Sequence, residues 1–317
     1  MTVDTSPDFV IAIAYCLAYD HLGRAPNRDI LQRLRGGAEP RTDEENWLAQ
    51  TLALAHSIVQ PPPAPEQAEE HLRHLKGVQE QAIHTERAQV ALVMGGATKI
   101  KQYVFESAKL PEIRGASALL DRINQVDIPA LFNVYTDTDD NLQVRNVREQ
   151  FARRHGMAPP DAPECVIYAN GGEFLAFAPV ILAQALADEV EFLYTSATLV
   201  ANSVAVWQAF TPVELAGGVG ASAFWQRWEQ VAYQKRVAAV LGQHVVKELP
   251  RKKRFGELAS VLAGEKFRRR EGNAVIDKAG TVLRPPKSTP QWETFAYGRR
   301  CRSCERRPGL ACVPYRR

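Results

Sequence analysis

The sequence predicts an α+β protein in which a four-stranded sheet carries two crossover helices. Short apolar runs bounded by glycine or polar residues predict strands, and they fall at residues 89–94, 165–169, 174–177 and 203–210. Stretches with helical apolar spacing separate the first run from the second and the third from the fourth. The order of strand, helix, hairpin, helix and strand is the βαββαβ arrangement of a ferredoxin-like domain.

Helices are expected on the N-terminal side of the sheet. Residues 9–17 and 47–55 are apolar segments of helical character. The run 61–65 holds four prolines in five residues, which cannot continue a helix and favour an extended spacer. A domain boundary is therefore predicted there, followed by a charged helix over residues 65–81.

The first strand is expected to end in a tight turn at Gly95-Gly96, because paired glycines after an apolar run are typical of turns. Thr98 is expected to cap the helix that follows, at residues 99–107. Residues 127–162 show weak periodicity and carry no assignment.

A second helix is predicted at Ala118–Ile123, after Pro111 has interrupted the first. Small residues at a helix start expose backbone amides to an anion, and an arginine there can clamp a phosphate. Arg114, Gly115, Ala116 and Ser117 are therefore candidate nucleotide-binding residues. The alternative is that Gly115 and Ala116 let the helix pack closely on the sheet while Arg114 pairs with Glu112.

The hairpin holds the second candidate site. Asn170-Gly171-Gly172 is a turn whose residues tolerate positive φ, and Glu173 follows it. A glycine pair lets backbone approach a triphosphate, and acidic residues beside it can hold divalent ions such as Mg²⁺. A second acid is missing after Glu173, and Met94–Thr98 supplies none, so two-metal catalysis is not expected. The alternative is a simple hairpin turn.

The rest of the sheet domain and its extension are predicted as helices and one strand. They are a helix at 179–195, a strand at 203–210, one long helix at 220–241 and a helix at 255–270. These features divide the chain into a helical N-terminal region (1–64), a linker helix (65–87), the sheet domain (88–246), a basic helical extension (247–298) and a cysteine-containing end (299–317).

Composition indicates a protein of the cytoplasm. No run of the 317 residues has the length of uncharged sequence that a bilayer span needs, and no signal peptide is recognised. The five cysteines are an odd number, with Cys16 and Cys165 isolated, which argues for a reducing compartment.

The basic residues gather at the C-terminal end. Residues 247–317 hold 19 Lys and Arg against 7 Asp and Glu, a net charge of +12, and the rest of the chain carries −9. The runs Arg251–Arg254 and Arg268–Arg270 are typical of nucleic-acid contact, with a solvated charged face as the alternative.

The terminal cysteines suggest a partial zinc knuckle. Cys301, Cys304 and Cys312 supply three soft ligands, whereas a structural zinc ion takes four. A fourth ligand would come from polypeptide beyond Arg317 or from a partner. The alternative is that these are free thiols in a disordered basic tail.

Four segments resemble, in the same order, the first palm domain of the large subunit of type III CRISPR effector complexes. The resemblance covers about residues 88–312, and its segments are 99–121, the hairpin 166–174, Arg254–Leu262, and Cys301-Arg302-Ser303-Cys304 with Arg307-Pro308 behind it.

The resemblance implies a long chain with a nuclease-like domain, a non-catalytic first palm, a zinc module and a catalytic second palm. That subunit sits on a guide RNA complex, and target RNA triggers its second palm to join ATP into cyclic oligoadenylate in a pocket that the first palm completes. The implied ligands are ATP at a shared site and Zn²⁺, and the implied partners are other effector subunits, guide RNA and target RNA.

This chain departs from that pattern. It ends before any second palm, so a separate second-palm polypeptide is a possible partner and no catalysis is expected from the chain alone. Residues 1–64 are expected to be a degenerate remnant of the nuclease-like domain, because Asp20-His21 reverses the order of a His-Asp dyad.

Two other functions stay open from the residues. A stand-alone palm-type nucleotide cyclase would use Glu173 as a metal ligand, although the missing acids argue against it. A basic RNA-binding adaptor would act through the segment from Lys247 onward.

Overall fold

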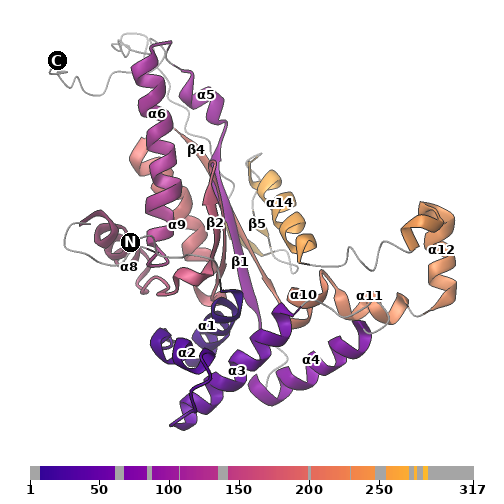
Figure 1. Ribbon diagram of the computed structural model, residues 1–317. Helices are drawn as coiled ribbons and strands as arrows, with labels where there is room; N and C mark the ends of the chain where they lie inside the picture. Colours follow the sequence, from indigo (N-terminus) through magenta and orange to yellow (C-terminus); the bar gives the residue numbers. More distant parts are fainter. Residues whose placement is uncertain are drawn as a thin grey trace.

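The computed structural model describes residues 8–60, 68–83, 88–106, 108–134, 142–198, 201–228, 230–246, 255–270, 275–276 and 281–284. Within these ranges no helix is both long and apolar enough to cross a bilayer. The elements, most of them labelled in Figure 1, are in chain order α1 (Phe9–Leu22), α2 (Arg28–Arg35), α3 (Asp43–Val59), α4 (Ala68–Ile83), β1 (Val90–Thr98), α5 (Ile100–Val104), α6 (Leu110–Arg122), the π-helical turn η2 (Ile123–Asp127), α7 (Ile128–Ala130), α8 (Leu142–His155), the 3₁₀ turn η3 (Pro163–Cys165), β2 (Val166–Asn170), β3 (Glu173–Ala178), α9 (Val180–Thr198), β4 (Asn202–Phe210), α10 (Pro212–Gly217), α11 (Ala221–Trp228), α12 (Val231–Leu241), α14 (Gly256–Arg270), β5 (Val275–Ile276) and β6 (Val282–Arg284).

An antiparallel sheet of strand order β2-β3-β1-β4 forms the centre of the described structure (Figure 1). β1 pairs with both β3 and β4, and β2 pairs with β3 through the hairpin. Helices from α5 to α8 connect β1 to β2 along the chain, and α9 connects β3 to β4. The protein is therefore α+β, as the sequence predicts, and its strands follow the order of a βαββαβ unit.

β1 runs through Gly95 and Gly96 to Thr98, so the turn predicted at the glycine pair is wrong. A side chain has no room at either glycine. A Cβ on Gly95 would lie 2.7 Å from that of Ala205, and one on Gly96 would lie 2.0 Å from the carbonyl oxygen of Gly172. The two glycines allow neighbouring backbones to come close, and they do not reverse the chain.

Three helix boundaries also differ from the predictions. Thr98 does not cap α5; the residue before that helix is Lys99, which has a φ of 53° and makes no side-chain capping bond. α6 begins early enough to include Pro111 in its first turn, where the missing N–H of proline costs nothing. The single helix expected over 220–241 is two helices, α11 and α12, and Gln230 precedes the second one.

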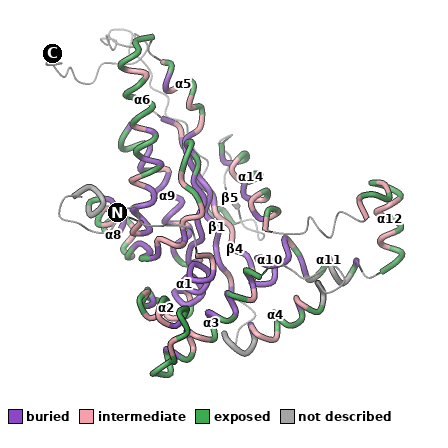
Figure 2. Tube along the Cα trace, in the orientation of Figure 1, coloured by how far each residue is buried: buried purple, intermediate pink, exposed green. Residues whose placement is uncertain are grey.

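α1 packs against the sheet and belongs to its core (Figures 1 and 2). Every residue of α1 from Val10 to Tyr19 is buried. The ring of Phe9 meets the edge of the Phe177 ring at 5.6 Å, and Phe177 also lies 5.9 Å from Phe255, just before α14. The buried residues of α1, the sheet and α9 form one continuous cluster. The predicted domain limits stay a prediction.

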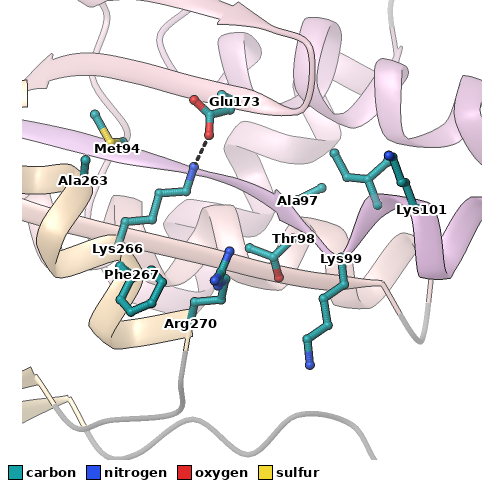
Figure 3. A pocket seen from close by; sticks show the side chains of 11 residues that line it. Met94, Ala97, Thr98, Lys99, Lys101, Glu173, Ala263, Lys266, Phe267 and Arg270 are labelled. Atoms are coloured by element: carbon teal, nitrogen blue, oxygen red, sulfur yellow. Dashed lines mark hydrogen bonds and ion pairs between the residues drawn. The ribbon is translucent and has the colours of Figure 1, made fainter.

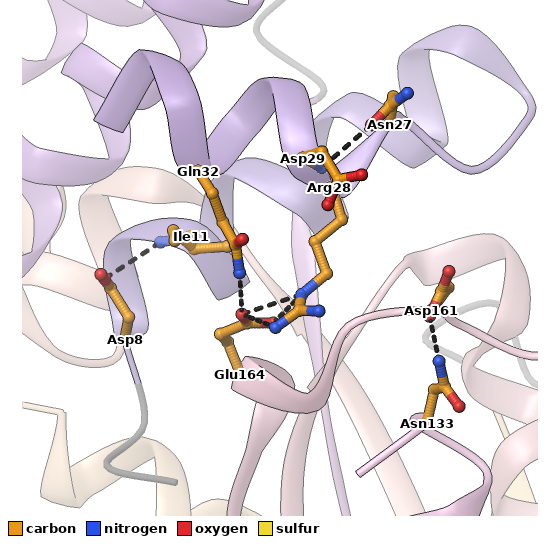
Figure 4. Close-up of polar contacts among 9 residues, drawn as sticks. All are labelled: Asp8, Ile11, Asn27, Arg28, Asp29, Gln32, Asn133, Asp161 and Glu164. Atoms are coloured by element: carbon orange, nitrogen blue, oxygen red, sulfur yellow. Dashed lines mark hydrogen bonds and ion pairs between the residues drawn. The ribbon is translucent and has the colours of Figure 1, made fainter. Parts of the chain in front are cut away.

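Polar side chains attach the N-terminal helices to the sheet domain. Asp20 of α1 accepts hydrogen bonds from the backbone N–H groups of Val180 at 2.7 Å and Ile181 at 3.0 Å, at the start of α9. Arg28 of α2 binds both carboxylate oxygens of Glu164, with a shortest N–O distance of 2.6 Å (Figure 4). Both contacts bridge more than 130 residues of sequence and fix where α1 and α2 lie.

Cys16 and Cys165, isolated in the sequence, are neighbours in the fold. α1 contacts η3, and this brings the two Sγ atoms to 3.8 Å. Both side chains are fully buried and both thiols are free.

Candidate functional site

A pocket of about 570 Å³ lies at the end of β1, between the β2–β3 turn and α14 (Figure 3). Glu173 is the one carboxylate among the described residues that line it. Apolar and small side chains form much of the wall, and the charged lining consists of Glu173, Lys99, Lys101, Lys266 and Arg270. The pocket therefore carries an excess of positive charge beside the hairpin.

The hairpin turns Glu173 toward this pocket. Gly171 and Gly172 have φ values of 62° and 81°, which is the geometry of a two-residue hairpin turn. Alternate residues of a strand share a face, so Glu173, Leu175 and Phe177 of β3 point to the same side of the sheet. Phe177 contacts Phe255 on that side of the sheet, and α14 packs there against β1 and β4.

Side chains of η2 and α9 form hydrogen bonds that hold the β2–β3 hairpin in place. The Nδ2 of Asn124 donates to the carbonyl oxygen of Glu173 at 3.1 Å, and the Nε2 of Gln125 donates to Asn170 Oδ1 at 3.1 Å. The hydroxyl of Tyr194 donates to Asn124 Oδ1 at 3.2 Å. Burial raises the pKa of Tyr194, so its hydroxyl keeps the proton that this bond requires. The π-helical turn thus directs two consecutive side chains at the hairpin.

Lys266 and Glu173 form the ion pair at the centre of the pocket. Figure 3 shows Lys266 reaching from α14 to Glu173, with 2.5 Å between Nζ and Oε1. The Lys266 side chain is 14% exposed and that of Glu173 is 54% exposed. The Tyr168 hydroxyl makes a long contact of 3.5 Å with Glu173 Oε2. Burial, and then the charge of Glu173, raise the pKa of Tyr168.

Three further cations of the lining come from two parts of the chain. Lys99 follows β1 directly, and Lys101 lies in the first turn of α5. Arg270 ends α14, and its guanidinium lies 4.9 Å from the centre of the Phe267 ring. Cations on two sides of the pocket can bind an anion that carries several charged oxygens.

Among the predicted hairpin residues, Glu173 lines the pocket, and the glycines lie beside it with different surroundings. Gly172 is buried; its carbonyl oxygen accepts a bond from the Ala97 N–H at 3.0 Å, and a Cβ there would lie 2.7 Å from Ile100. Gly171 is exposed, with open space around its Cα. Gly172 is therefore closely packed by the protein, and nucleotide contact at Gly171 and Gly172 stays a prediction.

The segment Arg114–Ser117 lies inside α6 and not at its start. Backbone N–H groups beyond the first turn of a helix bond to the carbonyl four residues before, so the predicted exposure of these amides is wrong. The packing alternative also fails at Gly115, which is exposed and would place a Cβ in open space. Nucleotide contact by the side chains of Arg114 and Ser117 stays a prediction.

The basic run Arg268–Arg270 is partly structural. Arg269 is 6% exposed and lies 3.4 Å from Glu191. Glu191 in turn accepts the backbone N–H of Ala205, in β4, the last strand of the sheet, at 3.0 Å. Arg269 therefore does not belong to a solvated or RNA-binding face. The run 251–254 lies outside the described residues, as do Cys301, Cys304 and Cys312.

Sequence reasoning did not single out Lys99, Lys101 and Lys266 as site residues. Lys99 and Lys101 stand in the segment that resembles the first palm, five and seven residues after Met94, so the end of the first strand was a usable signal. Lys266 is 93 residues from Glu173, and no local pattern predicts that contact.

Comparisons with known proteins give a weak structural similarity and no relative by sequence. No family model matches the chain, and no curated protein matches it. Among solved structures, a chain from the crystal structure of the apo Csm1-Csm4 cassette matches with a TM-score of 0.29 and 13% identity. The match covers 66% of this chain and 32% of the other, so this chain spans about a third of that one's length.

Proposed function

We propose that the chain is the first, non-catalytic palm of a type III CRISPR effector large subunit, and that it supplies the cationic wall of an ATP site which a second palm completes. The observation that carries this proposal is the basic pocket at the β2–β3 hairpin, with Glu173 as its one described carboxylate. Two of the segments that resemble the first palm, 99–121 and the hairpin 166–174, contribute residues to the lining of this pocket, which supports the proposal.

The composition of the pocket favours binding over catalysis. Two-metal phosphoryl transfer needs several carboxylates that hold two divalent ions about 4 Å apart. Met94, Ala97 and Thr98 stand at the end of β1, where such an acid would lie, and Glu173 is already paired with Lys266. The chain binds and orients the triphosphate, and the second palm supplies the metal ligands.

The assembly role rests on the basic C-terminal part. We place contacts to guide RNA and to neighbouring subunits in residues 247–317, which carry the net charge of +12. Cys301, Cys304 and Cys312 would hold Zn²⁺ together with a fourth ligand from a partner or from continuing polypeptide. The cytoplasm is the compartment in which these thiols stay reduced.

Reconstitution tests the proposal. The full chain is co-expressed with a guide RNA and a second-palm polypeptide of a type III system, and cyclic oligoadenylate formed from ATP is measured after target RNA is added. We expect product only when both polypeptides are present. The double variant Lys99→Ala/Lys101→Ala should lower product about tenfold or more while the complex still assembles, because it removes two positive charges that line the pocket.

The matched control is Lys235→Ala, since Lys235 is an exposed lysine of α12 outside the pocket. It should leave product formation unchanged. The proposal is contradicted if the two polypeptides never co-purify with guide RNA, or if the Lys99→Ala/Lys101→Ala complex makes product at the wild-type rate.

A further inference from the structure

The ion pair between Lys266 and Glu173 puts a cation beside the carboxylate of the pocket, the kind of group that would hold a divalent metal ion in a nucleotide site. Metal ions in such sites bridge a carboxylate and the phosphate oxygens. Here the ammonium group of Lys266 lies 2.5 Å from Glu173 Oε1. A lysine carries three donors, so two remain for other acceptors in the pocket.

The fold holds Lys266 in this position. Leu258 and Leu262 of α14 are fully buried, and Lys266 follows them at the same four-residue spacing. Residues four apart share one face of a helix, so Lys266 extends the buried stripe toward the hairpin. Phe255 anchors the start of the helix on Phe177, 5.9 Å from ring to ring. The aliphatic stem of Lys266 is therefore packed, in agreement with the 14% exposure of its side chain.

A divalent ion is poorly supported by the same pocket. Mg²⁺ takes six oxygen ligands and is held in proteins by carboxylates together with phosphates and water. Glu173 is the one carboxylate of the described lining, and Lys266 already neutralises it. The ionisable lining carries a net charge of +3, which suits a polyanion that arrives without its own cation.

We propose that this pocket binds the polyphosphate of a nucleoside triphosphate without a divalent metal ion, with Lys266 bridging Glu173 and the phosphate oxygens where a metal would otherwise lie. The inference rests on the proposed function and specifies how its site recognises the ligand. An RNA backbone is the weaker fit, because it needs cations along several successive phosphates. The four cations of the described lining instead surround one pocket of about 570 Å³.

Binding calorimetry of the full chain with ATP, in EDTA and in excess Mg²⁺, tests the inference. We expect the dissociation constants in the two buffers to agree within about threefold. Inorganic tripolyphosphate should compete with ATP, and adenosine should not. Lys266→Met keeps the aliphatic stem and should weaken ATP binding in EDTA about tenfold or more, whereas Lys235→Ala should not change it.

A second pair of variants separates a metal-like role from general charge. In Lys266→Met, Glu173 is released to hold Mg²⁺, so Mg²⁺ should restore part of the ATP affinity. In Lys266→Met/Glu173→Gln, Mg²⁺ should restore none of it. Glu173→Gln alone is expected to keep Mg²⁺-independent binding, because Lys266 and the other cations remain.

The outcomes are distinguishable. ATP binding that requires Mg²⁺ overturns this inference and leaves the proposed function in place. A chain that binds no ATP in either buffer overturns this inference, and the reconstitution with a second palm then decides the proposed function separately. A chain that binds a fluorescent single-stranded RNA but no ATP, and whose RNA affinity falls in Lys266→Met, would identify RNA as the ligand. That result would overturn the ligand class proposed here.

Discussion

Gly96 must be glycine for two independent reasons. Its φ of 147° is one that other residues rarely adopt, and a Cβ would lie 2.0 Å from the carbonyl oxygen of Gly172. Gly96→Ala should therefore lower the free energy of unfolding by about 3 kcal/mol or more, measured by urea denaturation. The strain falls on the hairpin, so Lys266 and Glu173 should also separate.

Gly115→Ala is the control for that substitution. Gly115 lies inside α6, and an added Cβ would meet nothing within 4 Å. Alanine in a helix interior is favoured over glycine by roughly 1 kcal/mol, so this variant should be as stable as the wild type or more stable. A Gly96→Ala variant as stable as Gly115→Ala would show that the backbones near Gly96 do not lie as close as described.

The buried thiols make a second prediction at the level of single residues. Burial raises the pKa of Cys16, and the thiolate is the form that reacts with alkylating agents. Both thiols are also fully buried, so Cys16 and Cys165 should stay unmodified by iodoacetamide at pH 8 in the folded protein and react fully after denaturation. Peptide mass spectrometry separates them from the other cysteines. Native labelling as fast as in denaturant would be incompatible with their burial.

At the level of elements, the Arg28–Glu164 pair joins α2 to η3. Burial raises the pKa of Glu164, but its hydrogen bonds, above all those from Arg28, and the charge of Arg28 together hold the pKa below its ordinary value. Arg28→Met should cost roughly 2 kcal/mol at pH 7 because it leaves a half-buried carboxylate without its partner. Since the folded pKa is depressed, this stabilisation is present above the unfolded pKa and is lost as pH falls through the folded one.

The measurement is thermal or urea unfolding of wild type and Arg28→Met between pH 3 and pH 7, with the difference shrinking toward low pH. Arg24→Met is the control, because the Arg24–Glu44 pair is exposed on both sides. Exposed pairs contribute about 0 to 1 kcal/mol. An Arg28→Met difference that does not change with pH would contradict the depressed pKa.

The elements with strong local signals were predictable, and those that depend on neighbouring strands were not. The hairpin, α9 and α14 follow from turn residues and apolar spacing and were predicted closely. The glycine pair Gly95-Gly96 predicts a turn, but the same pair also occurs in a strand whose neighbouring backbones approach closely, and the sequence alone does not separate the two cases. The helix predicted at Ala118–Ile123 is shorter than α6, because Pro111 predicts an interruption, whereas proline is compatible with the first turn of a helix.

For the whole molecule, the candidate site depends on contacts across most of the chain. Glu173 was predicted from the hairpin alone, whereas Lys266 comes from a helix 93 residues later. The contact between the free thiols of Cys16 and Cys165 likewise joins residues far apart in the sequence. Local sequence patterns carry no register between distant elements, so the acid of the site could be predicted and the cation that neutralises it could not.

Deleting residues 285–317 separates the roles of pocket and tail. The described lining residues all precede Glu271, so ATP affinity should be unchanged in calorimetry. Zinc content, measured by mass spectrometry, and RNA affinity should both fall, because the deletion removes Cys301, Cys304, Cys312 and a large share of the basic residues. Unchanged RNA binding would place the RNA contact elsewhere; loss of ATP binding would move the site into the tail.

The bond from Ala205 to Glu191, backed by Arg269, has a consequence for how the protein associates with copies of itself. An edge strand is a template on which another chain can add a strand, and proteins protect such edges with charged or covering groups. Here a carboxylate takes one N–H of β4, and a buried arginine holds that carboxylate in place. Removing Arg269 would therefore be expected to promote edge-to-edge aggregation, which light scattering would record as growth in particle size before any loss of helix.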